Sequence, residues 1–196
     1  PEIGLFNLQC LAQALLPLLD RDAAIAALNG YQAQFETAHM ARFREKLGLN
    51  TREEADESLL NALLDLMQSS RTDWTIFWRR LCDFDSRPQA PNAPLRDLFL
   101  DRAAFDAWAV DYQAQLQREA SIDSERQAQM RQVNPKYILR NHLAEQAIRS
   151  AQAGDFSEID TLRRLLARPY DEQLEFEAYA GLPPDWANDL SVSCSS

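Results

Sequence analysis

Glycine and strand-like patterns are scarce in this sequence. Only 5 glycines occur among 196 residues, each of them isolated, and runs of β-branched residues are absent. Alanine, leucine, glutamine, glutamate and arginine dominate instead, and all of these have a high intrinsic helix propensity. The sequence therefore predicts an all-α protein with a single helical domain of roughly eight helices.

Long apolar runs and an excess of basic charge are also missing. No stretch approaches the roughly eighteen apolar residues of a membrane-spanning helix, and no basic-then-apolar leader is present, so we expect no membrane partner. The formal net charge of −10 would repel a polyanion, so nucleic acid is not an expected partner either. Because the first residue is Pro1 rather than methionine, we expect a fragment or a processed product.

Cysteine is rare, with Cys10, Cys82 and Cys194 as the 3 examples. Their spacing fits neither a disulfide framework nor a zinc site. Cys10 and Cys82 lie within apolar helical patterns, which predicts buried, unreactive thiols. Cys194 is close to Asp185, Asp189 and the terminal carboxylate, whose negative charges disfavour a thiolate, so the surrounding sequence does not activate it.

The 2 histidines each lie three residues from a glutamate. Glu36 and His39 share one helix face, as ligands of carboxylate-bridged di-iron bundles do, whereas His142 and Glu145 have the opposite order. Such a centre needs a second Glu-x-x-His and two further glutamates. We assign surface or packing roles to these histidines and predict no metal site. Glycine-rich phosphate loops and hydrolase motifs are also absent, so we predict no catalytic or cofactor-binding residue in this chain.

Apolar residues recur at helical spacing along most of the chain. A helix–helix hairpin is predicted near the C-terminus, with its first helix entered at Asn134-Pro135 and its second stopped by Pro169. Further helices are predicted at 5–16 and from about 20 to 47, the second with a disturbance at Asn29-Gly30. A capping box at 51–54 predicts the start of the next helix. Three more helices are predicted after Thr72, from about 102 and at 121–133, and residues 84–95 are predicted to form a loop.

The last segment, residues 169–196, has a different composition and forms a tail to the helical domain of residues 1–168. It contains no Lys or Arg after Arg168, but several acidic and large apolar side chains. Because the apolar groups are too numerous for a solvated linker, we expect the tail to lie against the protein. The aromatic side chains would anchor it, and its acidic groups would face a basic surface.

Several short phrases of the sequence occur in a characteristic order. The phrases are Asn-Pro-Lys-Tyr-Ile-Leu-Arg-Asn at 134–141, Ala-Ile at 147–148, Gly-Asp at 154–155, Arg-Pro-Tyr-Asp-Glu at 168–172, Pro-Pro-Asp-Trp-Ala at 183–187 and Cys-Ser-Ser at 194–196. Together they resemble the C-terminal region of the selenoprotein O family. The opening Gly4–Leu8 with Leu11-Ala12 is similar to the segment that follows the family's nucleotide-binding centre.

This resemblance implies a kinase-like protein that binds ATP with Mg²⁺ and transfers AMP to protein side chains. The chain would be its helical C-terminal part, with the N-terminal kinase-like half and protein substrates as partners. The nucleotide-binding and catalytic residues would all precede Pro1. The family also implies a cytoplasmic location in bacteria and a mitochondrial one in eukaryotes. The alternative from composition alone is a stand-alone helical scaffold that binds other proteins.

The resemblance singles out Cys194, Arg140 and Asn141. In the family, the third position from the end is a selenocysteine or a cysteine and is associated with redox control. Our hypothesis is that Cys194 forms a disulfide with a cysteine upstream of Pro1. In one interpretation, Arg140 and Asn141 brace the catalytic half or the acidic tail. In the other, they serve only in helix capping and surface ion pairing. The sequence favours capping and surface pairing, since exposed ion pairs are common.

Overall fold

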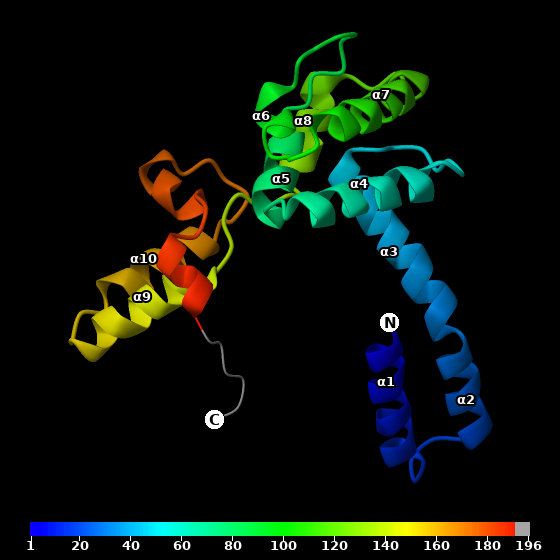
Figure 1. The fold of residues 1–196 in the computed structure, drawn as a ribbon. Coiled ribbons are helices and arrows are strands. Elements are labelled where there is room, and N and C mark those ends of the chain that lie inside the picture. Colours follow the sequence, from blue (N-terminus) through cyan, green and yellow to red (C-terminus); the bar gives the residue numbers. More distant parts are fainter. Residues whose placement is uncertain (191–196) are drawn as a thin grey trace. The chain divides into compact units, whose positions relative to one another are not determined.

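The computed structural model describes residues 1–190, which contain ten α-helices, two 3₁₀-helices and no strand (Figure 1). The predicted all-helical fold is confirmed, although the helices outnumber the expected eight. Within these residues no helix is both long enough and apolar enough to cross a membrane. The chain divides into two compact units, Pro1–Arg44 and a second that begins at Glu45.

Unit 1 consists of three helices with little buried surface. They are α1 (Glu2–Leu15), α2 (Arg21–Asn29) and most of α3 (Tyr31–Leu47), so the predicted disturbance at Asn29-Gly30 is a true helix break. No residue of α1 or α2 is buried. The predicted burial of Cys10 is therefore wrong: its thiol is exposed, because α1 has only a shallow contact with α2 in this unit.

Unit 2 is built around a cluster of aromatic side chains. It contains the end of α3, then α4 (Asp56–Ser70), α5 (Trp74–Leu81), α6 (Ala93–Arg96), α7 (Arg102–Arg118) and α8 (Asp123–Arg131). Helix α4 lies against α7, as Figure 1 shows. Rings pack against one another in a continuous chain through the core, at centroid distances of 4.9 to 6.5 Å, from Phe77 through Phe99, Phe105, Trp108 and Tyr112 to Phe84.

Two of the large rings of this core donate hydrogen bonds to backbone carbonyls. The Trp108 indole N–H donates to the carbonyl of Leu59 at 3.0 Å, and the Tyr112 hydroxyl donates to the carbonyl of Leu47 at 2.5 Å. Both side chains are almost wholly buried. Such bonds allow large rings with polar atoms to pack inside without an unsatisfied donor.

The predicted capping box at 51–54 is wrong. Helix α4 starts at Asp56, and the Thr51 hydroxyl instead donates to the Glu119 carboxylate, 2.7 Å away at the end of α7. Glu53 accepts from the Arg118 guanidinium at 2.9 Å. Contacts with α7 thus replace the local cap, which a pattern of four residues cannot reveal.

The C-terminal hairpin is confirmed, but its entry differs from the prediction. It consists of α9 (Asn141–Gln152) and α10 (Ser157–Leu166), followed by the 3₁₀-helices η1 (Leu174–Ala180) and η2 (Asp185–Asp189). Residues 135–140 are not helical. Asn134 is fully buried, and its side-chain amide exchanges two hydrogen bonds of 2.9 Å with the ammonium and the carbonyl of Lys46. Proline here ends a buried turn rather than starting a helix.

Two glycines of unit 2 have positive φ angles and allow a matched stability test. At Gly48 (φ +67°) an added Cβ would lie 2.5 Å from Cγ of Arg126 and 2.7 Å from Sδ of Met130, whereas at Gly154 (φ +87°) it would meet nothing within 4 Å. Arg126 and Met130 are buried and have no room to move.

We expect Gly154→Ala to lower the free energy of unfolding by about 1 kcal/mol, the cost of left-handed backbone strain. Gly48→Ala adds an overpacked contact and should cost about 2–4 kcal/mol in total. Urea unfolding followed by circular dichroism measures both values. Equal losses in the two variants would contradict the close packing of Arg126 and Met130 around Gly48.

Candidate functional site

Two of the family phrases, 134–141 and 168–172, lie side by side in the structure. The backbone N–H groups of Lys136 and Tyr137 both donate to the carbonyl of Pro169, at 2.9 and 3.2 Å. The Tyr137 hydroxyl donates to the carbonyl of Gln173 at 2.9 Å. We call this region the tail junction; it comprises Arg79, Asn134, Lys136, Tyr137, Glu172 and Gln173.

Gln173 fixes the point at which the tail leaves α10. Its side-chain amide donates to the carbonyls of Leu165 at 3.1 Å and Arg168 at 2.8 Å, and the residue is buried. These carbonyls belong to the end of the helix and the turn that follows it, where intrahelical donors are lacking. The tail therefore begins at a defined place and direction.

Arg79 is the centre of the tail junction. One of its terminal nitrogens donates to the carbonyls of Arg131 at 3.2 Å and Asn134 at 3.0 Å, and the other donates to the Tyr170 carbonyl at 3.0 Å and the Glu172 carboxylate at 2.6 Å. Its side chain is only 12% exposed. One guanidinium thus joins α5, the end of α8 and the tail.

The acidic tail meets its basic surface at the same place. Lys136 pairs with Glu172 at 2.7 Å and also with Glu177. Hydrogen bonds from Lys136 and then Arg79 hold the pKa of Glu172 at about 2, below its ordinary value of 4.5, although partial burial acts in the opposite direction. Glu172 therefore remains ionised over the whole physiological pH range.

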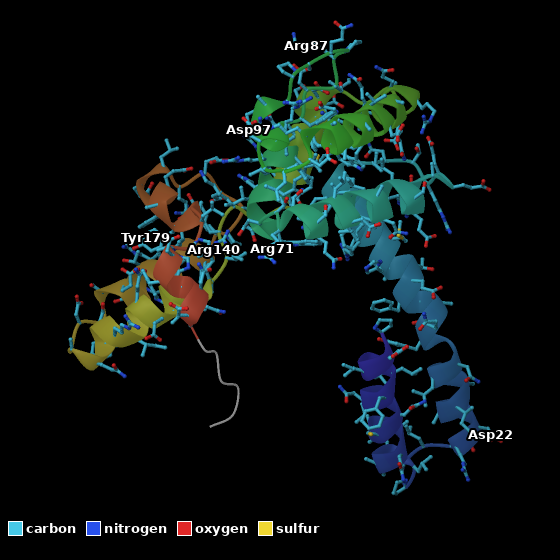
Figure 2. The ribbon with its side chains drawn as sticks, viewed as in Figure 1. Asp22, Arg71, Arg87, Asp97, Arg140 and Tyr179 are labelled. Atoms are coloured by element: carbon cyan, nitrogen blue, oxygen red, sulfur yellow. The ribbon has the colours of Figure 1, made fainter. Side chains whose placement is uncertain are left out.

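Arg140 braces a contact inside unit 2 rather than pairing at the surface. Its two terminal nitrogens lie 2.7 and 2.9 Å from the carboxylate oxygens of Asp73, and the two side chains are only 10% and 17% exposed. Asp73 also caps α5 by accepting from the amide of Ile76 at 2.9 Å. The favoured interpretation of Arg140 as a surface-pairing residue is wrong; Figure 2 shows it at the start of the C-terminal hairpin. Asn141 is simply the first residue of α9 and is exposed.

Aromatic side chains attach the rest of the described tail. Phe176 lies under the Arg164 guanidinium, 5.8 Å from the ring centroid, and Trp186 lies under that of Arg149 at 5.5 Å. The Tyr179 hydroxyl donates to the Glu158 carboxylate at 3.2 Å (Figure 2). Each contact joins the tail to the α9–α10 hairpin, so the tail follows this hairpin as far as Trp186.

The remaining residues that the sequence singled out are not brought together. His39 packs between the rings of Phe35 and Phe43 on α3, and Glu36 accepts a hydrogen bond from Gln32 at 2.6 Å. Cys82 is buried, as predicted, and burial raises the pKa of its thiol. Cys194 lies outside the described residues.

Sequence reasoning missed Arg79 and Asp73, which are the partners of the tail and of Arg140. Arg79 is separated from Glu172 by 93 positions, and Asp73 from Arg140 by 67. The one available signal was the charge asymmetry of the tail, which indicated a basic surface but not its location. The tail junction contains no activated nucleophile, so its geometry suits positioning rather than catalysis.

Comparison with known proteins finds relatives that match the chain along its whole length. It is 54% identical over 197 residues to the protein nucleotidyltransferase YdiU of Thiobacillus denitrificans and 50% identical over 208 residues to that of Paraburkholderia xenovorans. Both alignments cover 100% of this chain but 40% of the relative, so the chain spans about two fifths of the length of these curated relatives. The model of the family "Protein adenylyltransferase SelO" matches residues 1–167. The chain belongs to this SelO family, as its sequence phrases predicted.

Titration of Glu172 provides a test of the tail junction. The pKa of this group is lower in the folded than in the unfolded chain, so its stabilising effect is complete above about pH 5 and is lost as the pH falls towards 2. Since its side chain is 43% exposed, solvent screening limits the effect to about 1 kcal/mol.

We expect Glu172→Gln to lower the free energy of unfolding by about 1 kcal/mol at pH 7 and by almost nothing near pH 2. Urea unfolding of both proteins across this range measures the difference. Glu175→Gln is the matched control, because Glu175 is exposed on the same segment and no ion pair involves it among the described residues. A difference that did not shrink on acidification would contradict the ionic role of Glu172.

Proposed function

We propose that this chain is the helical C-terminal portion of a kinase-like protein adenylyltransferase. The intact protein would bind ATP with Mg²⁺ and transfer AMP to Ser, Thr or Tyr hydroxyls of protein substrates. The match to the SelO family over residues 1–167 carries this proposal. The lengths of the relatives support it as well, since they leave room for a separate catalytic half.

The exposed apolar residues of unit 1 support the presence of such a half. Ile3, Phe6 and Leu18 are 78%, 62% and 81% exposed, and further leucines of α1 and the following turn are also accessible. Burying a large apolar side chain contributes about 1.5–3 kcal/mol, and a unit of this size buries too little to be stable alone. We propose that the N-terminal kinase-like half covers this apolar face of unit 1.

Two observations on the described residues support our placing the nucleotide and magnesium site outside this chain. No group of three or more His, Cys, Asp or Glu side chains in residues 1–190 could hold a metal ion. At the tail junction, Arg79 and Lys136 are already paired with Glu172, so they are not available to a triphosphate. In our proposal the nucleotide-binding and catalytic residues precede Pro1, and this chain serves as a scaffold and as the support of the tail.

A labelling assay tests the proposal that the intact protein transfers AMP and that this chain alone does not. We expect the intact protein to incorporate label from α-³²P-ATP into protein in the presence of Mg²⁺, and the isolated chain to incorporate none. In the intact protein, Phe6→Asp should reduce labelling at least tenfold, because a carboxylate cannot be buried in the proposed interface without a large cost.

Gln34→Asp is the matched control on α3, outside the apolar face of α1. Gln34 is exposed and polar, so its replacement should leave labelling within twofold of wild type. Transfer of AMP by the isolated chain would overturn the proposal. Equal activity of the Phe6→Asp and wild-type proteins would remove the proposed interface.

We also propose that Cys194 forms a redox-sensitive disulfide with a cysteine that precedes Pro1. The described tail is attached to the hairpin up to Trp186, so only a short segment separates Cys194 from a fixed point. Extended residues span about 3.4 Å each, so the eight steps from Trp186 limit the distance to the Cys194 backbone to roughly 27 Å. Oxidised glutathione would accept the two electrons and two protons that the thiols release.

We expect the oxidised intact protein to migrate faster than the reduced one on a non-reducing denaturing gel, and Cys194→Ser to abolish this difference. Cys10→Ser, which removes an exposed thiol, should retain it. Labelling activity should change between the oxidised and reduced forms of wild type and of Cys10→Ser, but not of Cys194→Ser. Identical mobility and activity in both forms would show that the disulfide does not exist.

A further inference from the structure

A cavity of about 590 Å³ lies between the α9–α10 hairpin and the tail. A volume of this size is within the range of small-molecule sites. Its walls come from α9, α10, η1 and the turn before η2. The lining includes His142, Leu143, Gln146, Glu158, Tyr179 and Leu182.

The polar wall of the cavity is one face of α9. His142 and Gln146 are four residues apart, and Ser150 follows after another four, so all three project on the same side of the helix. The lining outside α9 carries the Glu158 carboxylate among mostly apolar groups, which include Leu182 from the tail. The cavity thus combines a few polar groups with apolar surface, as ligand sites do.

His142 supplies hydrogen-bonding capacity to this cavity. The residue is only 7% exposed and lines the cavity, and no hydrogen bond joins its imidazole to another described residue. Its ring nitrogens are not among the fully buried unpaired atoms, which is consistent with their facing the open cavity. The ring of Trp186 packs edge-on against it, with 6.3 Å between centroids. Buried polar side chains nearly always have a hydrogen-bonding partner, so an imidazole that lines a cavity without one has capacity to bind a further molecule.

The charged side chains around the cavity indicate the sign of the charge of its ligand. Glu158 is the one acidic side chain in its lining, and no Lys or Arg of the described residues lines it. Burial, followed by repulsion from Arg140, lowers the pKa of His142, so its imidazole is neutral at pH 7. The nearby cations are committed elsewhere: Arg140 to Asp73, and Arg149 to Glu145 at 2.7 Å. An anion would find no counter-charge here, whereas a cation would find Glu158.

We propose that this cavity binds an organic cation, an amine or guanidinium group on a short apolar stem. The cationic head would contact Glu158, whose second carboxylate oxygen has no protein partner among the described residues, and would lie within reach of His142 and Gln146. The stem would pack against Leu143 and Leu182. The ligand is either a free amine or the Lys or Arg side chain of a protein segment, and these two sources share one chemistry. This inference does not depend on the proposed transfer of AMP.

Proton NMR of the 196-residue chain provides the test, because its 2 histidines report separately on the two units. On titration with butylguanidinium, the Cε1–H resonance of His142 should shift in a saturable manner while that of His39 stays constant. The His142→Gln variant assigns the two signals. Glu158→Gln should weaken binding at least tenfold, and Asp160→Asn, an acidic control on the same helix but outside the cavity, should not weaken it.

Gln146→Trp gives a second test that does not remove a buried group. Gln146 is exposed at the edge of the cavity, so the larger ring should occlude the cavity and abolish binding while the circular dichroism spectrum stays unchanged. Butyrate has a similar stem but the opposite charge and should not bind. Tighter binding of acetyl-Gly-Arg-Gly-amide than of butylguanidinium would identify a protein segment as the source, and weaker binding would identify a free amine.

Three results would overturn the proposal. They are the absence of any saturable shift of His142, equal binding of butyrate and butylguanidinium, and unchanged affinity in a folded Glu158→Gln variant. The first result contradicts the existence of the site, the second the sign of the ligand charge, and the third the role of Glu158 in recognising the ligand.

Discussion

The C-terminal part of this protein depends on one guanidinium group. Arg79 donates to two carbonyls at the end of α8 and to a carbonyl and a carboxylate of the tail, and it does so with a side chain that is only 12% exposed. A charge held away from water is stable only when its donors are satisfied, and here protein oxygens satisfy the terminal nitrogens. Because these oxygens come from separate segments, the same requirement positions the segments relative to one another.

The tail junction shows what two of the family's sequence phrases do in the folded chain. The Asn-Pro-Lys-Tyr and Arg-Pro-Tyr-Asp-Glu segments contact each other through backbone hydrogen bonds and the pairing of Lys136 with Glu172. Together they set the course of the tail along the α9–α10 hairpin. The cavity beside His142 follows from this course, because residues of the tail form part of its lining.

Helices were predictable where the local pattern was sufficient. The break at Asn29-Gly30 and the α9–α10 hairpin follow from residues within a few positions of each other. The predictions failed where distant groups compete with local ones. Thr51 hydrogen-bonds to Glu119 instead of capping α4, and Asn134 binds Lys46 at the end of a turn instead of starting a helix. The prediction for Cys10 failed for a different reason. Its apolar pattern shows that a helix face can be buried, but not that another element is present to bury it, and the thiol is exposed.

The sequence alone determined the helical class, the family and the presence of an acidic, aromatic tail, because propensity, periodicity and composition are properties of neighbouring residues. The tertiary structure decided which partners those residues have. It placed Arg140 on Asp73, Glu172 on Arg79 and Lys136, and His142 at a cavity opposite Glu158. Ion pairs of this kind join residues tens of positions apart, and a charge in a sequence carries no information about which opposite charge the folded chain brings within about 3 Å of it.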